Sequence, residues 1–118
     1  MKTLFVCYPR CSTCRKARNY LEALGEDFEE RDIKEENPTE EELRAWVAES
    51  GLPLKRFFNT SGQIYRSLGL AKKLPDMSED EMFALLADDG MLVKRPIAVK
   101  GDKVVVAFKE EEWDQVFK

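Results

Sequence analysis

Two cysteines separated by two residues are the most reactive pair of side chains in this sequence. Cys11 and Cys14 follow the apolar run 4–8 and precede the apolar residues 17, 20, 21 and 24, whose spacing predicts a helix over about 12–24. The spacing therefore predicts that Cys11 lies where a strand ends and a helix begins. A helix N-terminus carries unpaired backbone N–H groups and a partial positive charge, and both favour a thiolate over a thiol.

Basic residues around this pair should strengthen the same effect. Four cations are close to Cys11 in the sequence: Arg10, Arg15, Lys16 and Arg18. Positive charge near a cysteine stabilises its thiolate, which is the nucleophilic form. Cys14 lies one helical turn further on, close enough to form a small disulfide with Cys11. We therefore predict that Cys11 attacks a substrate and that Cys14 resolves the resulting adduct.

The residues alone leave two other uses of the cysteines open. Structural zinc takes four ligands, mostly cysteine and histidine, and the chain has three cysteines and no histidine. One chain therefore cannot complete such a site, and no metal is expected. The other alternative is inert packing of both cysteines, since buried free cysteine is common. Cys7, inside the apolar run, is predicted to be such a small buried hydrophobe.

The length and charge of the chain restrict its class. At 118 residues it has the size of one domain, spanning 1–118. A net charge of −4 argues against direct nucleic-acid binding, which usually needs a basic surface. No apolar run approaches the ~20 residues of a membrane helix, and the N-terminus lacks signal-peptide features. We expect no membrane partner and a cytoplasmic location, where a CxxC pair is more often catalytic than a permanent disulfide.

The apolar pattern predicts a parallel strand–helix–strand unit, a run of helical pieces, and then a hairpin and a final helix. The elements of the two outer parts are expected at about 2–8, 12–24 and 27–33, and at about 98–99, 104–108 and 110–118. This order predicts an α/β fold with a thioredoxin-like core, βαβ…ββα, built on a mixed sheet. The helical pieces form an all-helical insertion at about 38–90.

Local signals place the helices of the insertion. Two capping boxes start its longer helices, Thr39 with Glu42 and Ser78 with Glu81. Shorter helices are expected at 53–58 and 63–68, and a loop is expected at 72–75. Leu24 in the first helix and Leu68 in the insertion are predicted to face inward. Glycine and proline interrupt the insertion too often for it to form a separate core.

Five motifs together resemble those of one known family. They are Cys11-Ser12-Thr13-Cys14-Arg15-Lys16-Ala17, Glu36-Asn37-Pro38, Phe58-Asn59-Thr60-Ser61-Gly62, Tyr65-Arg66-Ser67-Leu68-Gly69-Leu70 and Lys94-Arg95-Pro96-Ile97. With them, the chain resembles the arsenate reductase (ArsC)/Spx family of glutaredoxin-like proteins over almost its whole length.

The resemblance implies roles for individual residues. Cys11 would be the reactive cysteine, Arg95 would help to hold an oxyanion beside it, and Pro96 would be a cis-proline packed against the cysteine. An arginine presents a planar fork of donors that suits an oxyanion. Four further residues are assigned to the substrate or its anion: Ser12, Thr13, Arg15 and Asn59.

The sequence departs from the glutaredoxin-dependent arsenate reductases at their anion site. The resemblance implies that those enzymes have a single active cysteine surrounded by three arginines. Only one of these arginines is clearly matched in this chain, by Arg95. Asn59 falls where the first arginine would be, and the third would fall within 106–108, which is Val-Ala-Phe. Each lost charged hydrogen bond weakens oxyanion binding by about 1.5–3 kcal/mol. Cys14 replaces a common serine, which favours an internal disulfide with Cys11.

The resemblance therefore implies a thiol–disulfide oxidoreductase of the ArsC-like family, which reduces arsenate or another oxidised substrate through a covalent Cys11 adduct. No bound cofactor is expected, and thioredoxin or glutaredoxin with glutathione would supply electrons. The alternative is an Spx-like regulator, switched by the redox state of the CxxC pair, that binds the RNA polymerase alpha subunit. Gly51 falls near the polymerase-contacting glycine of that branch, although a glycine after a helix is also ordinary capping.

Overall fold

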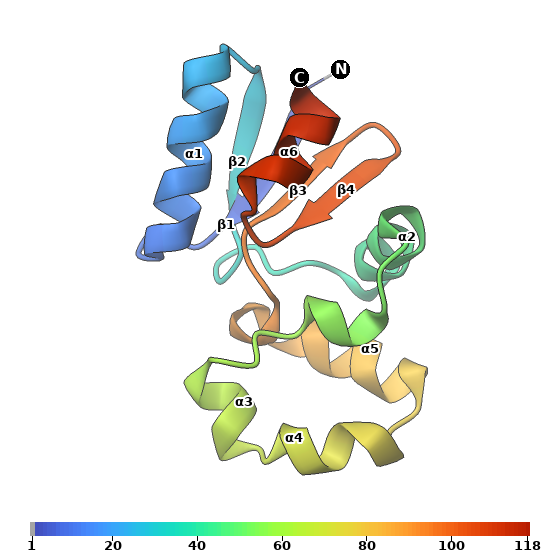
Figure 1. Cartoon of the computed structure of the whole chain (residues 1–118). Helices are drawn as coiled ribbons and strands as arrows, with labels where there is room; N and C mark the ends of the chain where they lie inside the picture. The colour runs from blue at the N-terminus through green and yellow to red at the C-terminus, as the bar shows by residue number, and fades with distance from the viewer. Residues whose placement is uncertain (1) are drawn as a thin grey trace.

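A four-stranded mixed sheet forms the centre of the computed structural model, which describes residues 2–118 (Figure 1). The strand order is β2-β1-β3-β4, with β1 parallel to β2 and antiparallel to β3. Strands β3 and β4 form an antiparallel hairpin. The strands are β1 (Thr3–Cys7), β2 (Phe28–Asp32), β3 (Ile97–Lys100) and β4 (Lys103–Val106). The predicted α/β fold with a mixed sheet is confirmed.

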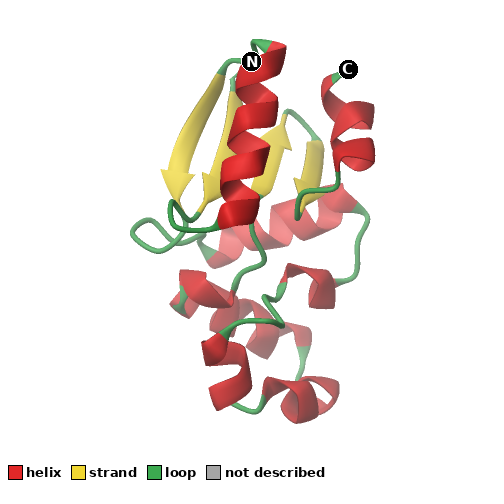
Figure 2. Cartoon of the chain, turned by 60° about the vertical axis from the view of Figure 1, so that its left-hand side comes forward, coloured by secondary structure: helices red, strands yellow, loops and turns green. Residues whose placement is uncertain are grey.

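Helices α1 (Ser12–Leu24) and α6 (Glu110–Phe117) cover one face of this sheet (Figure 2). Alternate residues of a strand point to opposite faces, so Phe5 and Cys7 of β1 both pack under these helices. Trp113 of α6 is fully buried there, and its Nε1–H donates a 2.8 Å hydrogen bond to the Ala107 carbonyl. This face therefore fixes the start of α1, where the cysteine pair lies.

The helical insertion packs against the opposite face and extends below the sheet in Figure 1. Val6 of β1 and Ile97 of β3 belong to the same buried cluster as the insertion. Its segments are α2 (Glu40–Ser50), η1 (Leu54–Phe57), α3 (Gln63–Ser67), α4 (Leu70–Lys73), η2 (Leu74–Asp76), α5 (Glu79–Asp88) and η3 (Gly90–Leu92), where η denotes a 3-10 helix. No helix within residues 2–118 is both long and apolar enough to cross a membrane.

The insertion contains more helical segments than predicted, and the prediction of a loop at 72–75 is wrong. Both capping boxes are present, but 72–75 spans the end of α4 and the start of η2. Leu70 and Leu74 are 2% and 3% exposed and lie one turn apart, so their burial holds this segment helical. Tertiary packing of this kind overrides the local breaking signal of Pro75.

Two burial predictions and one strand boundary are also wrong. Leu24 and Leu68 are 39% and 40% exposed. Leu24 is the last residue of α1 and Leu68 caps the end of α3, so each lies past the part of its helix that packs inward. Strand β4 ends two residues earlier than predicted because Ala107 has a positive φ of 63°. Its N–H donates instead to the Pro96 carbonyl at 2.9 Å.

Short backbone pairing fastens the insertion to the loop before β3. Phe58 and Val93 form an isolated antiparallel bridge. Beside it, the Asn59 N–H donates a 2.7 Å hydrogen bond to the Leu92 carbonyl. The motif that begins at Phe58 is therefore held next to the segment that bears Arg95, although the two are far apart in the sequence.

A close backbone contact requires glycine at position 90. A Cβ on Gly90 would lie 1.8 Å from the Ile33 carbonyl oxygen, far closer than any side chain can approach. The neighbouring Asn37 amide donates a hydrogen bond to the Ala87 carbonyl at the end of α5. Together these contacts seat the end of the insertion against the end of β2.

An ion pair joins β2 to α2. The Arg31 guanidinium donates two hydrogen bonds to the Glu42 carboxylate, at 2.7 and 2.8 Å. This arginine, together with the capping contact at Thr39, lowers the pKa of Glu42 to about 2. A carboxyl whose pKa is lowered by folding stabilises the protein above its unfolded pKa and loses that contribution as the pH falls through the folded value.

The Glu42→Gln variant is expected to be less stable than the wild type at pH 7, by about 1–2 kcal/mol, since it weakens the ion pair and the capping box. The difference should shrink as the pH falls from about 4.5 to 2. Urea unfolding followed across this range measures both quantities. Glu41→Gln, a change of an exposed carboxylate on the same turn, is the control, and an equal loss in both variants would contradict the assignment.

Candidate active site

A tight turn presents Cys11 at the start of α1. The Cys11 N–H donates a 2.9 Å hydrogen bond to the Tyr8 carbonyl, which closes the turn after β1. Cys11 is the N-cap of α1, with an extended backbone, and its side chain makes no capping hydrogen bond. The thiol is partly exposed. The first N–H groups of the following turn have no intrahelical acceptor and lie next to this side chain.

Cys14 lies on the same turn but is fully buried. The Tyr8 N–H donates to its sulfur at 3.3 Å. The pKa of Cys14 is raised well above its ordinary value, first by a hydrogen bond with the Cys7 thiol and then by burial. All three cysteines are free thiols. The pair therefore consists of an accessible sulfur at the helix cap and a protected, protonated one behind it.

The other residues that were assigned around Cys11 occupy the same end of α1. Ser12 and Arg15 are exposed and Thr13 is partly buried. None of these three lines the cavity that contains Arg95. Arg18 differs from the remaining cations near Cys11, because it forms an ion pair with Glu30 across to β2, at 2.6 Å.

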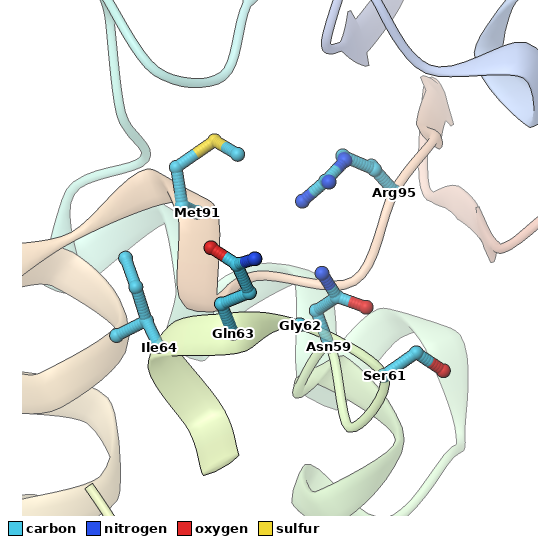
Figure 3. A pocket seen from close by; sticks show the side chains of 7 residues that line it. All are labelled: Asn59, Ser61, Gly62, Gln63, Ile64, Met91 and Arg95. Carbon is cyan, nitrogen blue, oxygen red and sulfur yellow. The ribbon is translucent and has the colours of Figure 1, made fainter. Parts of the chain in front are cut away.

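A cavity of about 420 Å³ lies between the insertion and the loop before β3 (Figure 3). Its walls are formed by Asn59, Ser61, Gly62, Gln63, Ile64, Met91 and Arg95. Two residues that the sequence singled out, Asn59 and Arg95, thus meet at one site although they lie on separate motifs. Figure 3 shows the Gln63 carboxamide and the Arg95 guanidinium turned toward the same space.

Two nitrogen atoms of the Arg95 guanidinium lack a hydrogen-bond partner in the part of the chain that the structure describes. Its Nε and Nη1 atoms are buried, and neither has a hydrogen-bond acceptor among residues 2–118. Its only stacking partner in that part of the chain is Tyr8, with Cζ 5.3 Å from the ring centroid. Burying a charged donor without an acceptor is costly, and a carboxylate or oxyanion would supply the missing acceptors. The Arg95–Pro96 peptide bond is cis, as the resemblance implies.

Tyr8 connects the cavity to the cysteine pair, and the sequence analysis missed it. Its backbone bonds to both cysteines, while its ring lies beside Arg95. Gln63 and Met91 were missed as well, although both line the cavity. Gln63 directly follows the motif that ends at Gly62, which is the one signal that could have marked it. Nothing local in the sequence marks Met91.

Comparisons with known proteins match this architecture. A family model described as the ArsC family matches residues 7–116. The uncharacterized protein YusI of Bacillus subtilis is 52% identical over 115 residues, which cover 98% of each chain. The regulatory protein MgsR of the same organism is 32% identical, covering 92% of this chain and 84% of its own. The structure of a possible arsenate reductase from Streptococcus mutans has a TM-score of 0.87 at 49% identity, covering 95% of this chain and 97% of its own.

The family match spans every part of the site. It includes Cys11 and Cys14 at the start of α1, the cavity residue Asn59, and the Arg95-Pro96 segment. The resemblance inferred from the five sequence motifs is thereby confirmed, and the mixed sheet with its helical insertion agrees with it. The chain belongs to the ArsC family.

Proposed function

We propose that this protein is a thiol–disulfide oxidoreductase in which Cys11 is the nucleophile and Cys14 the resolving thiol. The observation that supports this most strongly is the contrast between the two sulfurs. Cys11 is partly exposed at a helix N-cap, and Cys14 is fully buried on the same turn. A substrate can reach only the first of them.

The reaction follows from this contrast in two steps. The Cys11 thiolate attacks one sulfur of a substrate disulfide, forms a mixed disulfide and releases the other half as a thiolate. Cys14 then loses its proton and attacks the Cys11 sulfur, so that the Cys11–Cys14 bond forms and the second thiolate leaves. The substrate gains two electrons and the protein is oxidised. Thioredoxin, or glutaredoxin with glutathione, would return the pair to two thiols by the reverse exchange.

Arg95 gives the site a preference for anionic substrates. Its unpaired N–H groups would donate hydrogen bonds to one carboxylate or oxyanion of the substrate, and the carboxamides of Asn59 and Gln63 offer neutral hydrogen bonds beside it. Arsenate reduction would proceed through a covalent arsenical adduct on Cys11. One arginine can pair fully with a carboxylate, but it leaves most of the charge and oxygens of arsenate without a cationic partner. An organic disulfide that carries a carboxylate therefore suits the cavity better than arsenate does.

A redox titration tests the proposal. The purified protein is equilibrated in glutathione buffers of defined potential, and the Cys11–Cys14 bond is followed by mass, with arsenate reduction assayed in parallel. We expect a reversible bond with a midpoint of roughly −200 to −300 mV, the range of cytosolic dithiols. A pair that forms no bond at any potential would refute the dithiol mechanism and leave Cys11 as a lone nucleophile.

A second function is favoured by the 32% identity to the regulatory protein MgsR. In this alternative the same dithiol is a redox switch of the Spx kind, and the protein binds the RNA polymerase alpha subunit. Gly51 does not decide the question, because its φ of 70° at the end of α2 already requires glycine. Capture of the purified alpha subunit by the reduced and oxidised forms tests this alternative, and no binding in either state would exclude it.

A further inference from the structure

The part of the insertion that borders the Arg95 cavity carries only positive charge. Residues 51–75 contain no aspartate or glutamate, and their charged side chains are Lys55, Arg56, Arg66, Lys72 and Lys73. All 23 acidic residues of the chain lie outside this segment, although the chain has only 19 basic residues in total. The five cations are exposed, and none of them forms an ion pair within residues 2–118. Such a concentration of unpaired charge attracts partners of the opposite sign.

The α3–α4 corner, residues 65–73, adds an apolar centre to this charge. The chain turns between the two helices at Gly69, whose φ is 64°. Leu68, just before the turn, is 40% exposed, which is unusual in this chain for a large apolar side chain. A cavity of about 300 Å³ lies in the corner and is lined by Tyr65, Arg66, Gly69, Ala71 and Lys72. Apolar and aromatic groups surrounded by charged ones are the usual composition of a protein–protein interface.

Helix α3 joins the α3–α4 corner to the active site. Gln63 at its start lines the Arg95 cavity, whereas Tyr65 lines the cavity of the corner. The Tyr65 ring packs edge-on against Phe58, with ring centroids 6.4 Å apart, and Phe58 fastens the insertion to the segment that bears Arg95. In Figure 1, α3 lies below the N-terminal end of α1, where Cys11 is the cap. A molecule bound at the corner would therefore be a neighbour of the reacting thiol.

We propose that the α3–α4 corner docks an acidic segment of a protein substrate whose disulfide is presented to Cys11. The inference rests on the proposed thiol–disulfide function and adds the class of its partner. Carboxylates of the substrate face the basic side chains of the corner, and one of its apolar side chains covers Leu68. The chemical step is the exchange at Cys11 already described.

Two observations favour a polypeptide over other anionic partners. The corner has its own cavity, separate from that of Arg95, so a small disulfide bound at Arg95 leaves it unfilled. A polypeptide can extend along α3 and occupy both. A nucleic acid would meet the same cations, but the net charge of −4 opposes its continuous phosphate backbone and the exposed Leu68 gives it no partner.

Stopped-flow reaction of the reduced full chain with chromogenic peptide disulfides tests the inference. Each probe is a synthetic peptide whose single cysteine is linked to thionitrobenzoate, so that attack by Cys11 on the peptide sulfur releases a coloured thiolate. The acidic probe has glutamates and a leucine beside its cysteine, and the matched probe has glutamine in place of each glutamate. We expect the acidic probe to react about tenfold faster at low salt, as for electrostatically steered association. High salt should reduce this ratio, because it screens the charges.

Variants of exposed side chains assign the preference to the corner. Lys72→Glu should lower the ratio of the two rates by about threefold or more. Lys103→Glu changes the net charge equally and should leave the ratio as it is, since this exposed cation of the β3–β4 hairpin lines neither cavity. Leu68→Ser should slow both probes but not a probe that has serine in place of its leucine. All three variants should react normally with dithiodipyridine, a small uncharged disulfide.

The outcomes separate this inference from the proposed function. Equal rates with the acidic and glutamine probes, or a ratio that Lys72→Glu does not lower, would overturn the docking site. Dimers in analytical ultracentrifugation, or binding of a single-stranded RNA, that Lys72→Glu abolishes would assign the corner to a second copy or to nucleic acid and would overturn it too. A wild-type protein that releases no chromophore even from dithiodipyridine would instead refute the nucleophilic role of Cys11, which is the proposed function itself.

Discussion

The Cys11→Ser variant is expected to lose all turnover of a disulfide substrate, whereas Cys14→Ser should stop at a covalent intermediate. Serine has almost the shape of cysteine but is not a usable nucleophile at neutral pH without an activating base. Cys11 is the only cysteine of the three that is not buried, so neither Cys7 nor Cys14 can replace it. Turnover of a chromogenic disulfide with a thioredoxin donor measures the loss, which should reach the background rate.

The two variants should differ most clearly in the adducts that they form. Cys14→Ser keeps the N-cap thiolate and should accumulate one substrate thiol per chain, visible as a single added mass that a reductant removes. Cys11→Ser should form no adduct at the same substrate concentration. A Cys11→Ser protein that keeps full activity would eliminate the mechanism, and a Cys14→Ser protein with normal turnover would reduce Cys14 to a packing residue.

The parts of this fold that the sequence could predict are those that local signals encode. The bounds of α1 follow from the apolar repeat and from Gly25, whose φ of 72° ends the helix. The two capping boxes are equally local, because donor and acceptor lie three residues apart. The α4 segment was missed for the opposite reason. Its helical state depends on burying Leu70 and Leu74 in a core built from distant segments.

The site shows the same division between local and distant information. The position of Cys11 at a helix cap could be read from neighbouring residues, and the pairing of Asn59 with Arg95 followed from the family resemblance. The contact between Tyr8 and Arg95 could not be predicted, since it joins residues from opposite ends of the chain. The contacts of Arg18 with Cys7 and Glu30 likewise depend on how α1 crosses β1 and β2.

Arg95 lies at a point where binding and stability should conflict. Its buried Nε and Nη1 have no acceptor in the described chain, which lowers the stability of the folded protein while no anion is bound. Function often requires a strained or unpaired group at a binding site. Methionine has a similar length to arginine and no charge. Replacing Arg95 by methionine should therefore remove the anion contact and also remove the buried unpaired charge that destabilises the folded protein.

We expect Arg95→Met to raise KM for a disulfide that carries a carboxylate by about 10- to 100-fold, the equivalent of one charged hydrogen bond of about 1.5–3 kcal/mol. The KM for an uncharged disulfide such as hydroxyethyl disulfide should stay the same, since it has no group for the guanidinium. The unfolding midpoint in urea should rise. Lys94→Met, a change of the neighbouring partly buried cation that does not line the cavity, should alter neither KM. Equal effects of Arg95→Met on both substrates would show that Arg95 shapes the cavity and binds no anion.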